Sequence, residues 1–416
     1  MPTNRRAALS FIFITVLLDM LAFGIIIPIL PKLISNFLHG DIARSSEYLG
    51  LFVTVFAVMQ FFFAPVIGML SDRFGRRPVI LLSNFGLGLD YIVMALAPTL
   101  WWLFLGRLLS GLTSSSVPTA NAYISDITTP ETRSKAYGIF GAAFGLGFIL
   151  GPAAGGWLGH INPRLPFWVA AGFSLLNASY GFFILPESLP PDRRKPQLQW
   201  KRANPLGALK LLRSHHELFG LASVTFLNYL AHEVYVTVFV LYALNRYAWD
   251  ERDVGNSLAL VGITTSIVSA LLVARSVKRF GERTTLFLGL FLGGVGFALF
   301  GASPTGWMFL AAIPVNALWG LANPPLQTFM TQRVSKSEQG ELQGAIASLR
   351  GVAMIVGPGI FSATFAYFLA PSRNLPGAPW FLSALFLMIG LCLAWVVTPK
   401  SAARQEGAVA PSTTTA

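Results

Sequence analysis

The sequence predicts an all-α membrane protein with twelve transmembrane helices in two six-helix pseudo-symmetric bundles and both termini in the cytoplasm. Three observations predict this fold: 54% of the residues are hydrophobic and only 12% are charged, twelve apolar runs recur along the chain, and its two halves repeat. Soluble domains carry about 25% charged residues. The composition therefore excludes a disordered chain, a collagen-like chain and an ordinary soluble enzyme.

Each apolar run is close to the length of a transmembrane helix, because about 20 residues cross about 30 Å of hydrocarbon. In chain order the runs cover residues 9–34, 48–70, 78–97, 101–124, 136–158, 166–185, 218–243, 254–274, 284–301, 306–330, 342–369 and 378–397.

The longest polar stretch separates the sixth run from the seventh and is rich in proline and basic residues. The tail that follows the last run is rich in Ser, Thr and Ala, a composition typical of disorder. We therefore predict an N-terminal bundle at 1–185, a cytoplasmic central loop at 186–217, a C-terminal bundle at 218–397 and a disordered cytoplasmic tail at 398–416.

The net charge of +12 is explained by where the basic residues fall. If the N-terminus is inside, 22 of the 30 Lys and Arg residues lie in cytoplasmic segments, six lie outside, and Arg107 and Arg350 lie within spans. This bias is the positive-inside pattern of membrane proteins. It predicts a lipid bilayer as the surroundings and accounts for the charge without a nucleic-acid partner.

The two halves repeat at a constant offset of 206 residues. Residues 73–77 match 279–283, Pro118 matches Pro324, and residues 151–152 match 357–358. Two similar bundles can rock about a central site and expose it to each side in turn. The repeat therefore favours a transporter over a channel or an intramembrane enzyme.

Signals for an enzyme or a cofactor are missing from the sequence. No GxxxxGK[ST] phosphate loop is present, no His, Cys or Asp cluster has the spacing of a metal site, and no Ser–His pair is apparent. We expect no enzymatic activity, no metal and no cofactor.

Three motifs identify a family. Residues 68–77 (GMLSDRFGRR) resemble the signature loop of the major facilitator superfamily, and residues 107–111 (RLLSG) resemble its R-x-x-x-G element. Residues 147–156 (GFILGPAAGG) resemble the Gly-Pro element of the drug/proton antiporters in that superfamily. Finer matches, at 18–31, 89–91, 122–127, 185–188, 279–283 and 340–344, resemble the tetracycline-resistance branch.

The resemblance covers nearly the whole chain. It implies a proton-coupled antiporter of the bacterial inner membrane that exports tetracycline-like or other amphipathic small molecules, and we expect a monomer. One departure stands out: tetracycline/proton antiporters carry an acidic residue in the ninth span, where residues 290–296 offer glycine, including Gly293. A transporter of a sugar, siderophore or other metabolite with the same fold is the alternative, and a membrane scaffold or receptor is a third possibility.

Ionisable residues inside the spans are the candidates for proton coupling. Asp19 and Asp90 lie roughly 15–18 Å deep at 1.5 Å per residue. A charge at such a depth costs roughly 2.5–3.5 kcal/mol and suggests a functional site, the alternative being a structural hydrogen bond between helices. Arg107 is expected to pair with Asp19, and the resemblance implies a coupling role for it.

The second half offers a different set of ionisable groups. His232 and Glu233 lie near the middle of the seventh span, and Arg350 lies in the eleventh. Histidine titrates in the range that suits proton transfer. An ion pair between Glu233 and Arg350 with a purely structural role is the equally weighted alternative.

The segment 68–77 is predicted to form a cytoplasmic gate. Gly75 permits a tight turn, and Asp72 can lie against a helix N-terminus of the other bundle. The alternative is that its arginines only set the topology. The gate residues are Gly68, Asp72, Arg73, Gly75, Arg76 and Arg77.

Small residues of the fifth span are predicted to pack against the eighth span and to close the periplasmic side, with generic small-residue packing as the alternative. These residues are Gly147, Gly151, Pro152, Gly155 and Gly156. Polar side chains in otherwise apolar spans are the substrate-binding candidates. We single out Gln60, Asn121, Asn228, Asn316 and Gln327, while Asn84 and Asn323 share the pattern.

Overall fold

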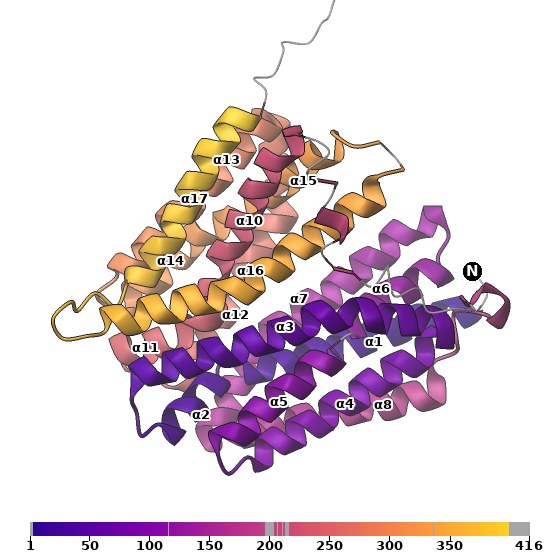
Figure 1. Cartoon of the computed structure of the whole chain (residues 1–416), viewed down its shortest axis with the longest axis horizontal. Coiled ribbons are helices and arrows are strands. Elements are labelled where there is room, and N and C mark those ends of the chain that lie inside the picture. The colour runs from indigo at the N-terminus through magenta and orange to yellow at the C-terminus, as the bar shows by residue number, and fades with distance from the viewer. Residues whose placement is uncertain are drawn as a thin grey trace, which may run out of the picture.

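Every regular element of the computed structural model is a helix (Figure 1). The structure describes residues 3–114, 116–195, 204–205, 207–209, 211–212, 216–335 and 337–398. Most of the central loop and the tail after Thr398 therefore lie outside the described residues. So do the predicted cytoplasmic residues Lys201, Arg202, Lys210, Arg213, Lys336, Lys400 and Arg404.

The first half contains α1 (Thr3–Ile26), α2 (Leu30–Phe37), α3 (Ile42–Phe74), α4 (Arg76–Leu96), α5 (Leu100–Thr113), α6 (Ser116–Ile127), α7 (Pro130–Ile161) and α8 (Leu165–Ile184). Two short turns follow, η1 (Pro191–Arg193) and η3 (Gly207–Leu209). The second half contains α10 (His216–Thr237), α11 (Phe239–Tyr247), α12 (Glu251–Ile267), η4 (Val268–Leu272), α13 (Val273–Ala302), α14 (Gly306–Ala317), η5 (Leu318–Leu321), α15 (Asn323–Thr331), α16 (Gln339–Phe368) and α17 (Ala378–Val397).

Eight helical segments of the described residues are long and apolar enough to cross a membrane, and the bent pair α10–α11 makes a ninth. One of the eight, Glu251–Ala302, has 52 residues. At 1.5 Å per residue it would be about 78 Å long, more than twice the thickness of the hydrocarbon. The backbone leaves the helical region at Gly281, between the predicted eighth and ninth spans. The count of twelve spans stays a prediction.

Five predicted spans are not single α-helices, and one of them, the eighth, passes from α12 through the π-helical η4 into α13. The fourth divides into α5 and α6, and at the equivalent place in the repeat the tenth divides into α14, η5 and α15. The first divides into α1 and α2, and the seventh bends by 50° between α10 and α11. Transporters place binding sites at such discontinuities, because the freed backbone and its neighbours line a cavity.

The repeat is visible in two equivalent turns. Gly75 and Gly281 both have a positive φ, of 107° and 78°, which glycine adopts without steric cost. Two residues later, Arg77 Nη2 donates to the Phe182 carbonyl at 2.6 Å, and Arg283 Nη2 donates to the Trp395 carbonyl at 3.1 Å. Each arginine thus neutralises the C-terminal end of the last helix in its own half.

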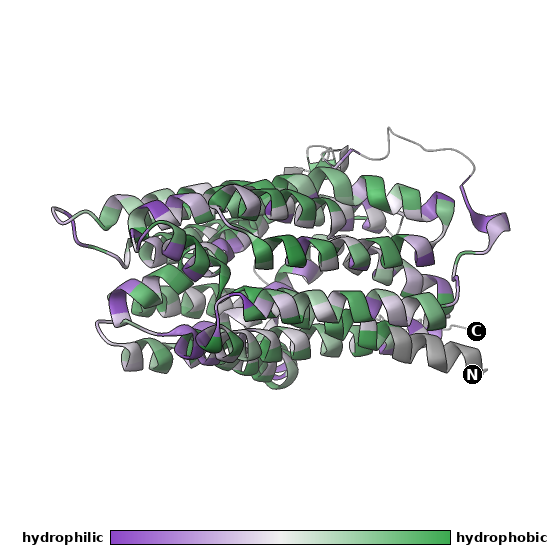
Figure 2. Cartoon of the chain, turned by 90° about the horizontal axis from the view of Figure 1, so that it is seen from below, coloured by the Kyte–Doolittle hydropathy of each residue, from purple (hydrophilic) through white to green (hydrophobic). Residues whose placement is uncertain are grey.

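Helices of each half pack mainly with one another. In the first half α1 packs against α7 and α8, and in the second half α10 packs against α16 and α17. Two helix pairs, α3 with α16 and α7 with α12, make most of the contact between the halves. The halves lie together at the end that holds α2 and α11 and diverge towards α6 and α15 (Figure 1). Hydrophobic residues predominate along the helices, with hydrophilic residues near the ends (Figure 2).

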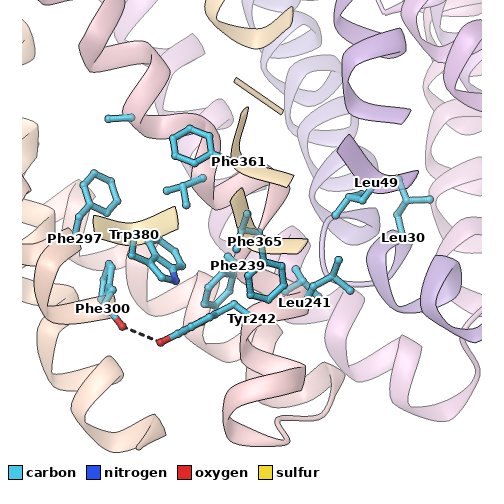
Figure 3. Packing of buried hydrophobic residues seen from close by; sticks show 14 of the residues in the cluster. Leu30, Leu49, Phe239, Leu241, Tyr242, Phe297, Phe300, Phe361, Phe365 and Trp380 are labelled. Carbon is cyan, nitrogen blue, oxygen red and sulfur yellow. Dashed lines mark hydrogen bonds between the residues drawn. The ribbon is translucent and has the colours of Figure 1, made fainter. Parts of the chain in front are cut away.

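A buried aromatic cluster holds the second half together (Figure 3). Trp380 of α17 is fully buried and lies 5.3 Å from the ring of Phe300 and 6.0 Å from that of Phe297, both on α13. Tyr242 of α11 donates from its hydroxyl to the Phe300 carbonyl at 3.0 Å. Phe297 also lies 5.2 Å from Trp319, so this core supports a residue of the broken tenth span.

We call the end that holds α2 and α11 the closed end, and the end that holds Gly75 and Gly281 the open end. Polar contacts between charged or titratable side chains join the two halves at the closed end. Lys32 Nζ lies 3.9 Å from Glu251 Oε1, and His160 Nδ1 lies 3.2 Å from Asp250 Oδ2. Ser46 Oγ also donates to the Ser362 carbonyl at 3.3 Å, from α3 to α16.

The small residues of α7 divide between two partners. A Cβ on Gly147, Gly151 or Gly155 would collide with α1, at Met20, Gly24 or Ile25. A Cβ on Gly156 would meet the carbonyl of Glu251, and one on Gly255 of α12 would lie 2.5 Å from the carbonyl of Pro152. The predicted packing against the eighth span is therefore correct for Gly156 and Pro152. It is wrong for Gly147, Gly151 and Gly155, because α1 crosses that face of α7.

Replacement of Gly151 by Val is expected to destabilise the fold by about 2 kcal/mol, because the new side chain would press on the backbone of Gly24. The measurement is the melting temperature of the purified protein. Gly138→Val on the same helix is the matched control, since no atom lies within 4 Å of its Cβ position. Equal melting temperatures for the two variants would contradict the close α1–α7 packing.

Removal of the charge of Glu251 is expected to loosen the closed end. Ser46→Cys, in a Cys392→Ser background, places a thiol at a fully buried position between α3 and α16. Glu251→Gln should raise the rate at which this thiol is alkylated in detergent about two- to fivefold, because a partly exposed ion pair such as Lys32–Glu251 contributes about 1 kcal/mol. Glu47→Gln, at an exposed residue next to Ser46, should leave the alkylation rate unchanged. An increase with Glu47→Gln, or no increase with Glu251→Gln, would refute the role of Glu251 in holding the closed end together.

Candidate functional site

A buried ion pair lies between α4 and α5. Arg107 Nη2 lies 3.8 Å from Asp90 Oδ2, and the Asp90 side chain is 0% exposed. Ser110 joins them, because its hydroxyl donates to Asp90 Oδ2 and accepts from Arg107 Nη2 at 3.1 Å. Gly106 makes the pairing possible, since a Cβ there would lie 2.9 Å from Asp90 Oδ1.

The predicted partner of Arg107 was wrong. We expected Asp19, but the ion pair that Arg107 forms is with Asp90. The reason is the helix arrangement: α4 and α5 pack directly against each other, and Asp90 lies opposite the last turns of α5. Asp19 of α1 instead accepts a hydrogen bond of 2.8 Å from Asn177 Nδ2 of α8, which also donates to the Thr15 carbonyl at 3.0 Å.

Further polar atoms are buried in the same half without a hydrogen-bond partner among the described residues. They come from α1, α4, α5 and α8, the helices that also carry the two carboxyl groups. The atoms are Thr15 Oγ1, both side-chain atoms of Asn84, Asp90 Oδ1, Arg107 Nε, Ser174 Oγ and Asn177 Oδ1. Buried polar groups of this kind are ordinarily satisfied by internal water.

Sequence reasoning missed Ser110, Asn177, Thr15 and Ser174. Ser110 lies three residues after Arg107 and therefore on the same helix face, so its spacing carried a signal. Asn177 was the sole amide in the sixth span, and it deserved the same weight as the amides that we selected.

The charged residues of the second half do not form the expected pair. Glu233 of α10 is buried against α16. A Cβ added to Gly357 of α16 would lie 2.7 Å from the Cβ of Glu233. Within the part of the chain that the structure describes, no ion pair within 4.0 Å joins Glu233 to Arg350; the Arg350 guanidinium lies 6.0 Å from the Tyr229 ring. Arg350 is seven residues from Gly357, about 10.5 Å along the helix, which explains the separation.

His232 is exposed although it lies near the middle of the predicted seventh span. Its ring is 5.8 Å from Trp319 of η5 and 5.9 Å from Tyr235. The neighbouring residue Glu233 points elsewhere, as expected for adjacent helical positions. His232 therefore belongs to a group of aromatic and amide side chains rather than to an acidic one.

Two substrate-binding candidates belong to that group and already make hydrogen bonds within it. Asn228 accepts from Trp319 Nε1 at 2.6 Å and donates to Asn323 Oδ1 at 2.8 Å. Asn316 accepts from the Tyr235 hydroxyl at 2.6 Å and donates to the Gly293 carbonyl at 3.4 Å. Both are buried, so they position aromatic rings and leave little capacity to bind a substrate.

The other candidates lie at the breaks of the fourth and tenth spans. Gln60 of α3 donates to the carbonyl and the hydroxyl of Ser114, both at 3.3 Å, where α5 ends. Asn121 of α6 is half-buried, whereas Gln327 of α15 is exposed.

The predicted gate is an ionic cluster within the first half. Asp72 contacts Arg76 Nη1 at 2.6 Å and Lys195 Nζ at 2.5 Å, and Arg76 Nε lies 3.1 Å from Asp126 Oδ2. Asp72 was expected against a helix of the other half. That prediction was wrong, because the halves diverge at this end and Lys195 of the central loop takes the position.

Glu187, which we did not select, organises this cluster. Its carboxylate accepts from the backbone N–H of Arg76 at 2.8 Å and of Arg77 at 3.3 Å, so it caps the N-terminus of α4. It also contacts Arg194 Nη2 at 3.8 Å. The signal was available, since Glu187 belongs to the matched segment 185–188. Arg73 lies over the exposed ring of Phe74, and Gly68 has no atom within 4 Å of its Cβ position.

Solved structures show the same fold. The nucleoside transporter NupG matches with a TM-score of 0.76 and 14% identity over 94% of this chain and 98% of its own. A bacterial homolog of the human lysosomal transporter Spinster, in an inward-facing and unoccupied conformation, also has a TM-score of 0.76, with 16% identity over 95% of this chain and 97% of its own.

Sequence comparison is more specific. The model of the Major Facilitator Superfamily matches residues 12–358 and 221–413. The class C tetracycline resistance protein of Escherichia coli is 36% identical over 92% of this chain and 95% of its own length. The class D protein of Salmonella ordonez is 35% identical over 94% and 97%. These findings confirm the resemblance, and the chain belongs to the Major Facilitator Superfamily and, within it, to the family of the tetracycline resistance proteins.

Proposed function

We propose that the protein exports tetracycline-like or other amphipathic drugs across the bacterial inner membrane in exchange for protons. It works as a monomer of twelve spans in two bundles, with both termini in the cytoplasm, and it needs no cofactor besides the proton as coupling ion. As a member of its superfamily it is a multi-pass membrane transporter and not an enzyme. Its tetracycline-resistance relatives favour drug export over transport of a sugar, siderophore or other metabolite.

The observation that carries this proposal is the buried set Asp90, Ser110 and Arg107. Uptake of a proton on Asp90 removes its negative charge and its attraction for Arg107. Ser110 can then donate elsewhere, and Arg107 is released from a partner that it needs in a low-dielectric interior. Protonation thereby changes which helix contacts between α4 and α5 are favourable, which is what coupling requires.

A proton path to this set has support from the unpartnered polar atoms. Thr15, Asn84, Ser174 and Asn177 lie on α1, α4 and α8, around Asp19 and Asp90. Water molecules that satisfy these atoms would link the two carboxyl groups, and such chains conduct protons. Asp19, bound to Asn177, serves as a second proton acceptor. In the second half, Glu233 is the carboxyl group that can exchange a proton, with Arg350 two turns away and His232 directed towards the aromatic group.

The orientation follows from the distribution of charge. The open end carries the basic turns around Gly75 and Gly281, and basic residues are favoured on the cytoplasmic side. We therefore place the open end in the cytoplasm and the closed end in the periplasm. The structure is then inward-facing, the state in which a drug enters from the cytoplasm. The cluster of Asp72, Arg76 and Glu187 is the cytoplasmic gate at rest.

Neutralisation of Asp90 is expected to abolish coupling. In inside-out vesicles with an acid interior, followed by an acridine dye, tetracycline should release protons and restore fluorescence. Asp90→Asn should reduce that recovery at least tenfold and Asp19→Asn should reduce it severalfold, because neither amide can carry the proton.

The matched control is Asp192→Asn, an exposed residue of η1 outside the bundles. It should behave as wild type. Recovery that persists in both Asp90→Asn and Asp19→Asn would refute coupling through these carboxyl groups. If wild-type protein that is inserted in the vesicle membrane gave no fluorescence recovery with tetracycline, the proposed substrate class would be refuted.

A further inference from the structure

The exposed face of α10 is directed at the space between the two halves. His232 is exposed while its neighbours Ala231 and Glu233 are buried. One turn earlier, Tyr229 lies under the guanidinium of Arg350. Arg350 precedes Gly351, at which a Cβ would collide with Phe61 of α3 in the first half. The side of α10 that carries Tyr229 and His232 therefore belongs to the inner surface.

Trp319 is held rigidly beside His232. It lies in η5, the break of the tenth span, and a Cβ on Gly293 would come within 2.8 Å of three of its atoms. The indole N–H donates to Asn228 Oδ1 at 2.6 Å, and the ring of Phe297 lies 5.2 Å away. The glycine at position 293 is what lets the indole lie against α13. A ring fixed in this way loses little conformational entropy when a ligand stacks on it.

An amide donor is linked to the Trp319 indole through Asn228. Asn323 Oδ1 accepts from Asn228, and among the described residues no other side-chain bond of Asn323 is present. Its Nδ2 hydrogens are therefore available, and the side chain is exposed. Gln327, one turn further along α15, is exposed as well. Carbonyl or phenolate oxygens on the edge of a ligand would match these donors.

We propose that His232 and Trp319 form a stacking site for a planar, fused-ring drug whose oxygen-bearing edge accepts hydrogen bonds from Asn323 and Gln327. The inference rests on the proposed function and names the chemical class that the second half recognises. The two rings lie 5.8 Å apart at 40°, which is the spacing of a packed aromatic pair. His232 is exposed and Trp319 is half-buried, so a planar ligand stacks on the open side of the pair and not between the rings. Asn228 and Asn316 act as positioning residues that hold Trp319 and Tyr235.

The test is direct binding to the purified full-length protein in nanodiscs, measured by equilibrium dialysis. The probes are tetracycline, 9-aminoacridine as a planar ring system without oxygen, and dodecyltrimethylammonium as an amphiphile without rings. His232→Leu and Trp319→Leu should each weaken tetracycline and 9-aminoacridine binding about five- to tenfold, the range of an aromatic pair. His232→Phe and Trp319→Phe should restore binding to within about twofold. Asn323→Leu should weaken tetracycline alone.

Controls separate stacking from damage to the fold. Trp307→Leu, at a tryptophan that is 82% exposed near the closed end, should change no affinity. Binding of dodecyltrimethylammonium should be the same in every variant. In the vesicle assay, Trp319→Leu should raise the tetracycline concentration for half-maximal proton release about five- to tenfold and leave the maximal rate unchanged, which a structural defect would not do.

The outcomes distinguish this inference from the proposed function. Unchanged tetracycline and 9-aminoacridine affinities in both leucine variants would overturn the stacking site while leaving drug export intact. Equal loss for dodecyltrimethylammonium would overturn the ring specificity. The wild type could bind 9-aminoacridine through His232 and Trp319 but neither bind nor transport tetracycline. That result would support the stacking site and refute the proposed tetracycline-like substrate. Failure to bind either planar probe overturns both.

Discussion

The packing of the first half depends on a carboxylate and a guanidinium that are buried together between α4 and α5. A lone charge at such depth costs roughly 2.5–3.5 kcal/mol, and loss of one partner from a buried pair costs about 3–5 kcal/mol. The Asp90–Arg107 pair is therefore stable only while α4 and α5 stay in contact and Asp90 stays ionised. Protonation removes one of these conditions, which makes helix packing in the first half sensitive to proton binding.

The two halves share a framework but differ in the chemistry it carries. Gly75 and Gly281 make equivalent turns, and Arg77 and Arg283 cap equivalent helices, α8 and α17. The first half then buries Asp19 and Asp90, whereas the second half places rings and amides around Trp319. Because Gly293 leaves space for an indole, an acidic residue at that position would displace Trp319 from α13. In the function that we propose, this difference places the main proton-coupling pair in the first half and the drug-stacking surface in the second.

Sequence patterns predicted the family and the repeat, because both depend on motifs along the chain. The structure buries Asp19 and Asp90, as expected for ionisable residues inside predicted spans. Partners across helices were harder to predict. Arg107 pairs with Asp90 and not with Asp19 because of a contact at Gly106, and Gly151 faces α1 because that helix crosses α7. Neither contact leaves a periodic signal. Asn228 shows the same limit. The sequence shows a polar residue in an apolar span, but not that its amide accepts a hydrogen bond from the Trp319 indole.

The breaks of the fourth and tenth spans connect these parts. At the break of the fourth span, Gln60 of α3 donates to the Ser114 carbonyl. The break of the tenth span contains Trp319 in η5. Each contact is therefore made where a span can change its helical pitch. Arg107 and Ser110 lie in the last two turns before the first break. A change in the charge of Asp90 acts on α5 at that point, while a ligand on Trp319 acts at the equivalent point of the other half. Two signals applied at equivalent hinges, across a closed end held by the partly exposed Lys32–Glu251 ion pair, can shift one equilibrium between inward and outward states. Exchange of protons for drug needs no direct contact between the two.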